Sequence, residues 1–136
     1  MKKFLAIAVF VSAILTAQAQ TLPVTQLKNL EGKWVSSETI ANDGKPMIVS
    51  FWATWCKPCI RELHAYQDYY AEWQEELGVK LIAISIDDTR NSAKVAPMAI
   101  GENWPYEVYI DENQDLKRNL GSVNVPAPLV LDGKGN

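Results

Sequence analysis

The stretch that decides the fold is residues 51–60, FWATWCKPCI, in which Cys56 and Cys59, the two cysteines of the 136-residue chain, stand three positions apart. It overlaps the end of MIVSFW, residues 47–52, a nearly unbroken apolar run. Such a run is typical of a strand buried on both faces of a parallel sheet. The sequence therefore predicts that the cysteine pair follows the carboxyl end of a central strand, where reacting groups gather in α/β sheets.

A helix is predicted directly after this strand. Apolar residues recur at spacings of three and four along one helical face: Leu63, Tyr66, Tyr70, Trp73 and Leu77. Gly78 comes next and is a natural C-cap. We therefore expect one helix from about the cysteine pair to Leu77.

Further strands and helices alternate along the rest of the chain. Strands are predicted at 79–86, 104–110 and 128–131, with helices between them over about 92–100 and 111–120. Asp87-Asp88-Thr89 can cap the first of these helices, and Pro97 inside it should kink or split it. This alternation predicts an α/β fold with a largely parallel sheet.

The two ends of the predicted domain carry turn signals. Residues 25–37, TQLKNLEGKWVSS, consist of two short runs around Glu31-Gly32 and predict a hairpin. Residues 132–135, DGKG, predict a turn after which a strand returns antiparallel. Because a bare apolar sheet edge is an aggregation hazard, we expect the sequence to be a fragment that is truncated at its C-terminus.

The first residues have the pattern of an export signal. In residues 1–19, two lysines precede a short apolar run and the small-residue site Ala17-Gln18-Ala19. This pattern predicts a cleaved signal peptide, with an uncleaved anchor as the alternative, and a domain over residues 20–136 that is periplasmic or otherwise exported. With a net charge of −3 and no basic cluster after the signal, we expect neither nucleic acid nor stable membrane insertion.

The position of the cysteine pair favours redox chemistry. Cys56 begins the predicted helix, where unpaired N–H groups and the helix dipole stabilise a thiolate, and Lys57 adds a cation. Pro58 suits a first helical turn, and Cys59 lies within reach of a disulfide. We therefore expect Cys56 to be the nucleophile and Cys59 to resolve the mixed disulfide.

Other uses of the pair are weaker alternatives. A zinc site needs four ligands, and the chain adds His64 as its single histidine. Copper bound by the two thiolates and His64 stays open as an alternative function. A purely structural bridge would close too short a loop to stabilise the fold much.

The sequence resembles the thioredoxin superfamily, and within it the TlpA/ResA-like exported oxidoreductases. The resemblance lies in FWATWCKPC at a strand-to-helix junction and in Val125-Pro126 shortly before the apolar residues 129–131. The resemblance implies a thioredoxin-like fold, a mixed sheet with flanking helices and an N-terminal hairpin extension. It also implies that the C-terminal strand and helix of this fold are missing. Pro126 matches the cis-proline that faces the cysteine pair in this superfamily, and Val125 would then pair its backbone with a bound peptide.

The resemblance also implies roles around the pair. Glu62 matches an acidic residue that assists proton transfer at Cys59, with a solvated first-turn glutamate as the alternative. Trp55, Lys57 and Pro58 would shape the surface on which a partner docks.

Three positions depart from the family pattern. Ser50 stands where thioredoxins have a buried aspartate, so proton transfer would depend more on Glu62 or water. His64 replaces a helix-kinking proline. Pro128 replaces a common threonine and suits only an edge strand or a strand start.

The function expected from these observations is dithiol-disulfide exchange with protein thiols and disulfides. The redox-active pair would need no organic cofactor and no metal. The resemblance favours a reductant of the cytochrome c maturation type that a membrane electron donor keeps reduced. A peroxidase of the related peroxiredoxin group is disfavoured because Ala53 stands where that group has the threonine or serine that positions peroxide.

Overall fold

A six-stranded mixed sheet forms the centre of the molecule. The computed structural model describes residues 22–122 and 124–132. The strand order across the sheet is β2-β1-β5-β4-β3-β6. The strands are β1 (Gln26–Asn29), β2 (Trp34–Ser36), β3 (Met47–Trp52), β4 (Lys80–Ser85), β5 (Glu107–Ile110) and β6 (Ala127–Leu131). The α-helices are α1 (Lys57–Leu77), α2 (Val95–Gly101) and α3 (Asp115–Asn119), with single 3₁₀ turns η1 (Ser37–Thr39) and η2 (Ser92–Lys94).

The pairing of the strands places the cysteines at one edge of the sheet. β4 runs parallel to both β3 and β5, whereas β6 is antiparallel to β3 and β1 is antiparallel to β5. Trp52, the last residue of β3, is aligned with Ser85, the last residue of β4. The segments that follow these two strands, Ala53 onward and Ile86 onward, therefore leave the sheet side by side.

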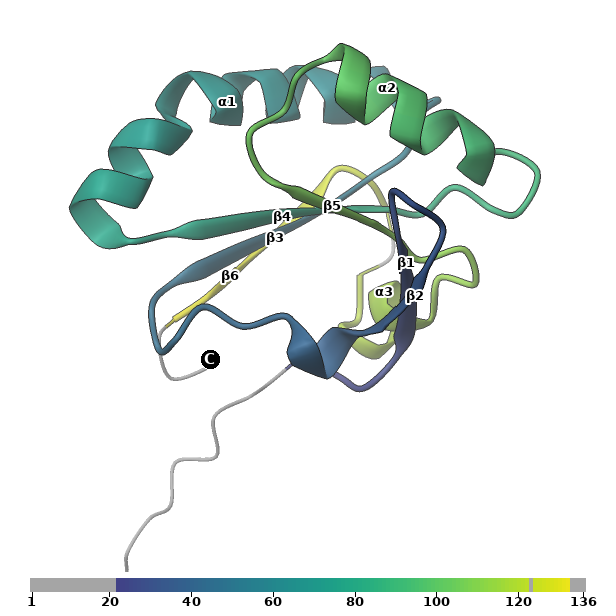
Figure 1. The fold of residues 1–136 in the computed structure, drawn as a ribbon, viewed down its shortest axis with the longest axis horizontal. Helices are drawn as coiled ribbons and strands as arrows, with labels where there is room; N and C mark the ends of the chain where they lie inside the picture. Colours follow the sequence, from purple (N-terminus) through teal and green to yellow (C-terminus); the bar gives the residue numbers. More distant parts are fainter. Residues whose placement is uncertain (1–21, 123, 133–136) are drawn as a thin grey trace, which may run out of the picture.

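Helices cover the sheet on both faces. Figure 1 shows α1 and α2 on one face of the sheet and α3 on the other. The core between these layers includes fully buried side chains of β3, β4 and the helices: Phe51, Trp52, Leu63, Leu81, Ile82, Ile84, Val95 and Leu116. Burying one such aliphatic side chain contributes about 1.5–3 kcal/mol. The near-continuous apolar character of β3 and β4 follows from their being covered on both faces.

Helix α1 has the predicted bounds, but its apolar face is buried over only part of its length. Leu63 and Tyr70 are buried, and Gly78 closes the helix in the left-handed conformation with φ 63°. Leu77, predicted to share their face, is 60% exposed. On a straight helix, residues seven positions apart differ in direction by about 20°. Leu77, two such steps after Leu63, therefore points away from the face that Leu63 buries.

The region between β4 and β5 differs in detail from the prediction. The segment is split as expected, but the boundary lies between η2 and α2, and Pro97 falls in the first turn of α2, where its missing N–H costs nothing. β5 begins at Glu107 rather than at Trp104. Trp104 and Tyr106 are nevertheless buried, because they pack against the core ahead of the strand.

Two further expectations on the fold are confirmed. Residues 26–36 form the antiparallel hairpin β1–β2. Pro128 lies in β6, the edge strand of the described sheet, where its missing N–H interrupts no second ladder of hydrogen bonds.

The proposed signal peptide lies outside the described residues. Within residues 22–122 and 124–132, no helix combines the length and the apolar character needed to cross a bilayer.

Candidate active site

A tight turn between β3 and α1 presents the first cysteine. The N–H of Cys56 donates to the carbonyl of Ala53 across 3.0 Å, which closes the turn 53–56. Trp55 stands at its tip and is 63% exposed, whereas Ala53 is buried. Cys56 is the N-cap residue of α1. The turn therefore places one aromatic side chain in solvent directly beside the cysteine.

Cys56 and Cys59 form a disulfide, with their Cα atoms 5.3 Å apart. Cys56 is 5% exposed and Cys59 is 1% exposed. The Sγ atom of Cys56 accepts the N–H of Cys59 across 3.3 Å. Because this sulfur already occupies the acceptor position at the helix N-terminus, a thiolate formed there on reduction is stabilised by the same N–H and by the dipole.

The rim of the pair consists of exposed side chains from the helix start. Lys57 and Pro58 are the first two residues of α1, and both are exposed. Together with Trp55 they form a surface around a nearly buried disulfide. These three residues are the exposed neighbours of the pair along the chain.

Val125 and Pro126 precede β6 and lie beside the end of β3. The peptide bond between them is cis. Phe51 of β3 pairs with Ala127 of β6, so the antiparallel register brings Pro126 and then Val125 alongside the end of β3, where the turn 53–56 begins. The structure thus brings these two residues to the same edge as the cysteine pair.

Glu62 is held between α1 and the sheet. The hydroxyl of Ser50, which is 1% exposed, donates to Oε1 of Glu62 across 3.1 Å. Burial raises the pKa of Tyr66 to about 12, and the negative charge of Glu62 and a hydrogen bond to it contribute to this shift. The carboxylate of Glu62 therefore has hydrogen-bond partners in β3 and in α1. The alternative of a solvated first-turn glutamate is wrong in position, because the first turn of α1 contains no acidic residue. Glu62 lies one helical turn after Cys59.

Asp87 is a site residue that the sequence did not reveal. It was expected to help cap a helix, but its carboxylate accepts the N–H of Thr54 at 2.8 Å and the hydroxyls of Thr54 and Ser85, both at 2.7 Å. Asp88 holds the following turn instead, because its Oδ1 accepts the N–H groups of Arg90 and Asn91. The one available signal was that Asp87 closely follows a buried strand that ends beside the cysteine turn.

His64 is engaged away from the cysteines. Its Nε2 lies 2.6 Å from Oε2 of Glu102, and its ring packs edge-on to Trp104 with centroids 6.4 Å apart. Across 22–122 and 124–132, no cluster of three or more potential metal-ligating side chains is found. The contact with Glu102 occupies Nε2, so only Nδ1 of His64 remains for a metal unless this contact breaks.

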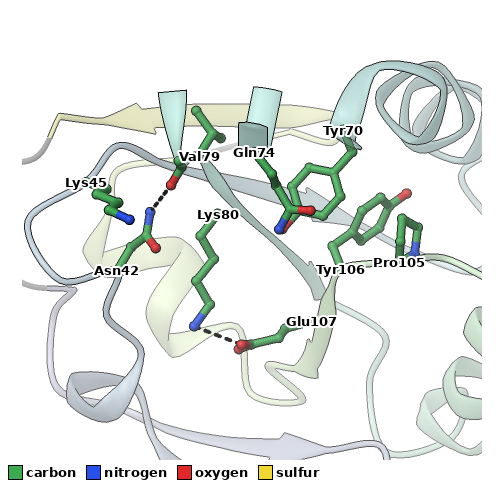
Figure 2. A pocket seen from close by; sticks show the side chains of 10 residues that line it. Asn42, Lys45, Tyr70, Gln74, Val79, Lys80, Pro105, Tyr106 and Glu107 are labelled. Carbon is green, nitrogen blue, oxygen red and sulfur yellow. Dashed lines mark hydrogen bonds and ion pairs between the residues drawn. The ribbon is translucent and has the colours of Figure 1, made fainter. Parts of the chain in front are cut away.

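A cleft lies at the other end of the sheet. Its volume is about 390 Å³, and its lining residues come from the segment before β3, the C-terminal part of α1, the start of β4 and the start of β5 with the two residues before it. Figure 2 shows Lys80 and Glu107 paired across it, with their charged atoms 2.8 Å apart. None of its lining residues belongs to the turn 53–56 or to the start of α1. This cleft is therefore separate from the disulfide.

Solved structures of thioredoxin-like proteins resemble this fold. A thioredoxin-like protein from Porphyromonas gingivalis is 52% identical, with a TM-score of 0.75 over 87% of this chain and 77% of that one. StoA from Bacillus subtilis is 26% identical, with a TM-score of 0.65 over 85% of this chain and 84% of that one. The thioredoxin-like fold expected from the sequence is confirmed.

Relatives in sequence show to which family of thioredoxin-like proteins the chain belongs. The thiol-disulfide oxidoreductase ResA of Bacillus thuringiensis is 32% identical over 107 residues, which are 79% of this chain and 59% of the relative. The chain thus spans less than two thirds of the length of this relative. The model of the AhpC/TSA family matches residues 19–136. The chain therefore belongs to the AhpC/TSA family, as a thioredoxin-like protein of the TlpA/ResA type.

Proposed function

We propose that this chain is a thiol-disulfide oxidoreductase that exchanges electrons with protein thiols and disulfides through Cys56 and Cys59. The observation that carries this proposal is a disulfide at the N-terminus of α1, in which Sγ of Cys56 accepts the backbone N–H of Cys59. The names of the relatives support it, since ResA is described as a thiol-disulfide oxidoreductase. The two cysteines carry the electrons, and no organic cofactor or metal enters the step.

The reaction starts from the reduced pair. The Cys56 thiolate attacks a disulfide of the partner, which forms a mixed disulfide and releases one partner thiolate. Cys59 then loses its proton and attacks Sγ of Cys56, which expels the second partner thiolate. The partner gains two electrons, the chain is left with the Cys56–Cys59 disulfide, and water protonates the released thiolates. Run backwards, the same steps oxidise a partner dithiol.

Glu62 takes the proton of Cys59 in this scheme. It lies one helical turn further along α1, so both side chains leave the same side of the helix. The hydroxyl of Ser50 holds its carboxylate against the sheet. Ser50 stands where other thioredoxins carry an aspartate, so Ser50 and Glu62 together supply the polar group beneath the pair.

The partner docks over the rim of the pair. Trp55 offers an exposed aromatic surface, and Lys57 and Pro58 surround the disulfide at the start of α1. The backbone of Val125, ahead of cis-Pro126, faces the same edge and can pair with an extended segment of the partner. An extended peptide of a protein substrate fits this arrangement better than a small molecule does.

We further propose that the protein is exported and acts as a reductant, of the kind that supplies electrons during cytochrome c maturation. The signal-like pattern of residues 1–19 and the resemblance to exported oxidoreductases support this direction. In an oxidising compartment the pair stays reduced only if another protein re-reduces it, so a membrane electron donor is part of the proposal.

The test is to trap the mixed disulfide. Cys59→Ser leaves Cys56 able to attack but removes the resolving thiol, so it should accumulate covalent adducts with a protein disulfide substrate such as oxidised insulin. Cys56→Ser is the matched control and should accumulate far fewer. Adducts formed equally by both variants, or by neither, would refute the assignment of Cys56 as nucleophile.

The alternatives lack the groups that they need. A peroxidase of the peroxiredoxin type would use a hydroxyl three residues before the nucleophile, and that residue is the buried Ala53. The neighbouring hydroxyl of Thr54 is already committed to Asp87. For a copper-binding module, His64 would have to ligate through Nδ1 or give up the contact of its Nε2 with Glu102.

A further inference from the structure

A buried carboxylate ties the cysteine turn to the end of β4. Asp87 is 0% exposed and lies just beyond β4. Its Oδ2 accepts the N–H of Thr54, and its Oδ1 accepts the hydroxyl of the same residue. Thr54 is the second residue of the turn 53–56 that Cys56 closes. The side chain of Asp87 thus holds the turn through two hydrogen bonds to Thr54, which lies two residues before the nucleophile.

The carboxylate is stabilised mainly by this turn. Ser85 supplies a third donor from β4 itself, through its buried hydroxyl. In the part of the chain that the structure describes, no lysine, arginine or histidine forms an ion pair with Asp87. A buried charge without a counterion is costly unless its oxygens are hydrogen-bonded, and bonds to a charged acceptor are stronger than neutral ones. Releasing Thr54 would therefore leave Asp87 poorly satisfied, so the tether resists opening.

We propose that Asp87 is a positioning residue for Cys56, and that it acts through Thr54 to keep the Cys56 sulfur at the N-terminus of α1 when the disulfide is open. The inference rests on the proposed exchange function. In the oxidised chain the bond to Cys59 already fixes Cys56 against α1. After reduction that bond is gone, and the turn must hold the thiolate near the N–H of Cys59. The tether therefore stabilises the reduced state more than the oxidised state.

Thr54→Val tests this with little risk to folding. It keeps the shape of the side chain and the N–H bond to Asp87 but removes the hydroxyl that pairs with Oδ1. Thr54→Ser restores a hydroxyl and is the rescue variant. Asp88→Asn is the matched control, because it alters the adjacent carboxylate, whose bonds go to Arg90 and Asn91 rather than to the cysteine turn.

The first readout is equilibrium with glutathione, in which two glutathione thiols give two electrons and two protons to the protein disulfide and leave as one glutathione disulfide. We expect Thr54→Val to lower the equilibrium constant for reduction of the Cys56–Cys59 disulfide about fivefold. This is the effect of losing one hydrogen bond that stabilises the reduced state but not the oxidised state. The pair thereby becomes harder to reduce. Thr54→Ser and Asp88→Asn should stay close to the unmodified chain.

The second readout is the pH profile of Cys56 alkylation by iodoacetamide in the reduced protein, whose midpoint should move to higher pH in Thr54→Val only. If Thr54→Val unfolds more easily in both redox states while the glutathione equilibrium and the pH profile stay unchanged, the tether is merely structural and the proposal is wrong. If the unmodified chain exchanges no disulfide with glutathione or insulin, the proposed function itself fails, and the two failures are distinct.

Discussion

Truncating Leu63 should strongly destabilise the attachment of α1 to the sheet. Leu63 is 0% exposed and lies four residues after Cys59 on the helix that carries the pair. Transfer of a buried leucine side chain from water is worth about 1.5–3 kcal/mol, and the cavity left by Leu63→Ala adds to the loss. We expect a decrease of about 3–4 kcal/mol in the free energy of unfolding, within the range of measured Leu→Ala changes in cores.

Leu77→Ala is the matched control for this change. It is the same substitution on the same helix, but Leu77 is 60% exposed, and alanine is a slightly better helix former. Its effect should stay within about 0.5 kcal/mol. In urea denaturation followed by circular dichroism, a slope of about 2 kcal/mol per M converts the Leu63 loss into a midpoint decrease of about 1.5–2 M. Similar midpoints for the two variants would refute the packing described for α1.

Two further predictions concern the same helix. The pKa of Tyr66 is raised to about 12 in the fold, from about 10 in an unfolded chain, so the unfolded state loses a proton that the fold keeps. The free energy of unfolding should therefore fall as the pH rises from about 10 to 12, and Tyr66→Phe should make this fall smaller. Urea denaturation at several pH values measures it. If the free energy of unfolding depends on pH equally in both proteins, the burial of this phenol is contradicted. Gly78→Ala should lower the free energy of unfolding by about 1 kcal/mol in the same assay, because Gly78 closes α1 at φ 63° and an added Cβ would lie 2.7 Å from Cδ of Lys45. An unchanged free energy of unfolding would contradict a left-handed glycine cap at this position.

The central strand, the helix after it and the cysteine pair were predictable because each has a strong local signal. β3 is a nearly unbroken apolar run, and Gly78 marks the end of α1. The bounds of both elements agree with the sequence. The mixed character of the sheet came from the resemblance rather than from the alternation of elements, which by itself indicated a largely parallel sheet.

The contacts that organise the site were not predictable, because they join residues far apart in the chain. Asp87 reaches Thr54 across 33 positions, and nothing local distinguishes it from Asp88, which does hold a turn. Ser50 departs from the family pattern in the sequence, but its hydrogen bond to Glu62 depends on how α1 lies over β3. The exposure of Leu77 likewise depends on where the helical face rotates away from the core.

The reduction potential of the Cys56–Cys59 pair, measured against glutathione or dithiothreitol, tests the central claim most directly. A reductant that is fed by a membrane donor should have a potential close to the value of about −270 mV found for thioredoxin. A potential near the value of about −120 mV found for strong oxidants would mean that the chain donates disulfides, and the proposed direction of electron flow would be wrong.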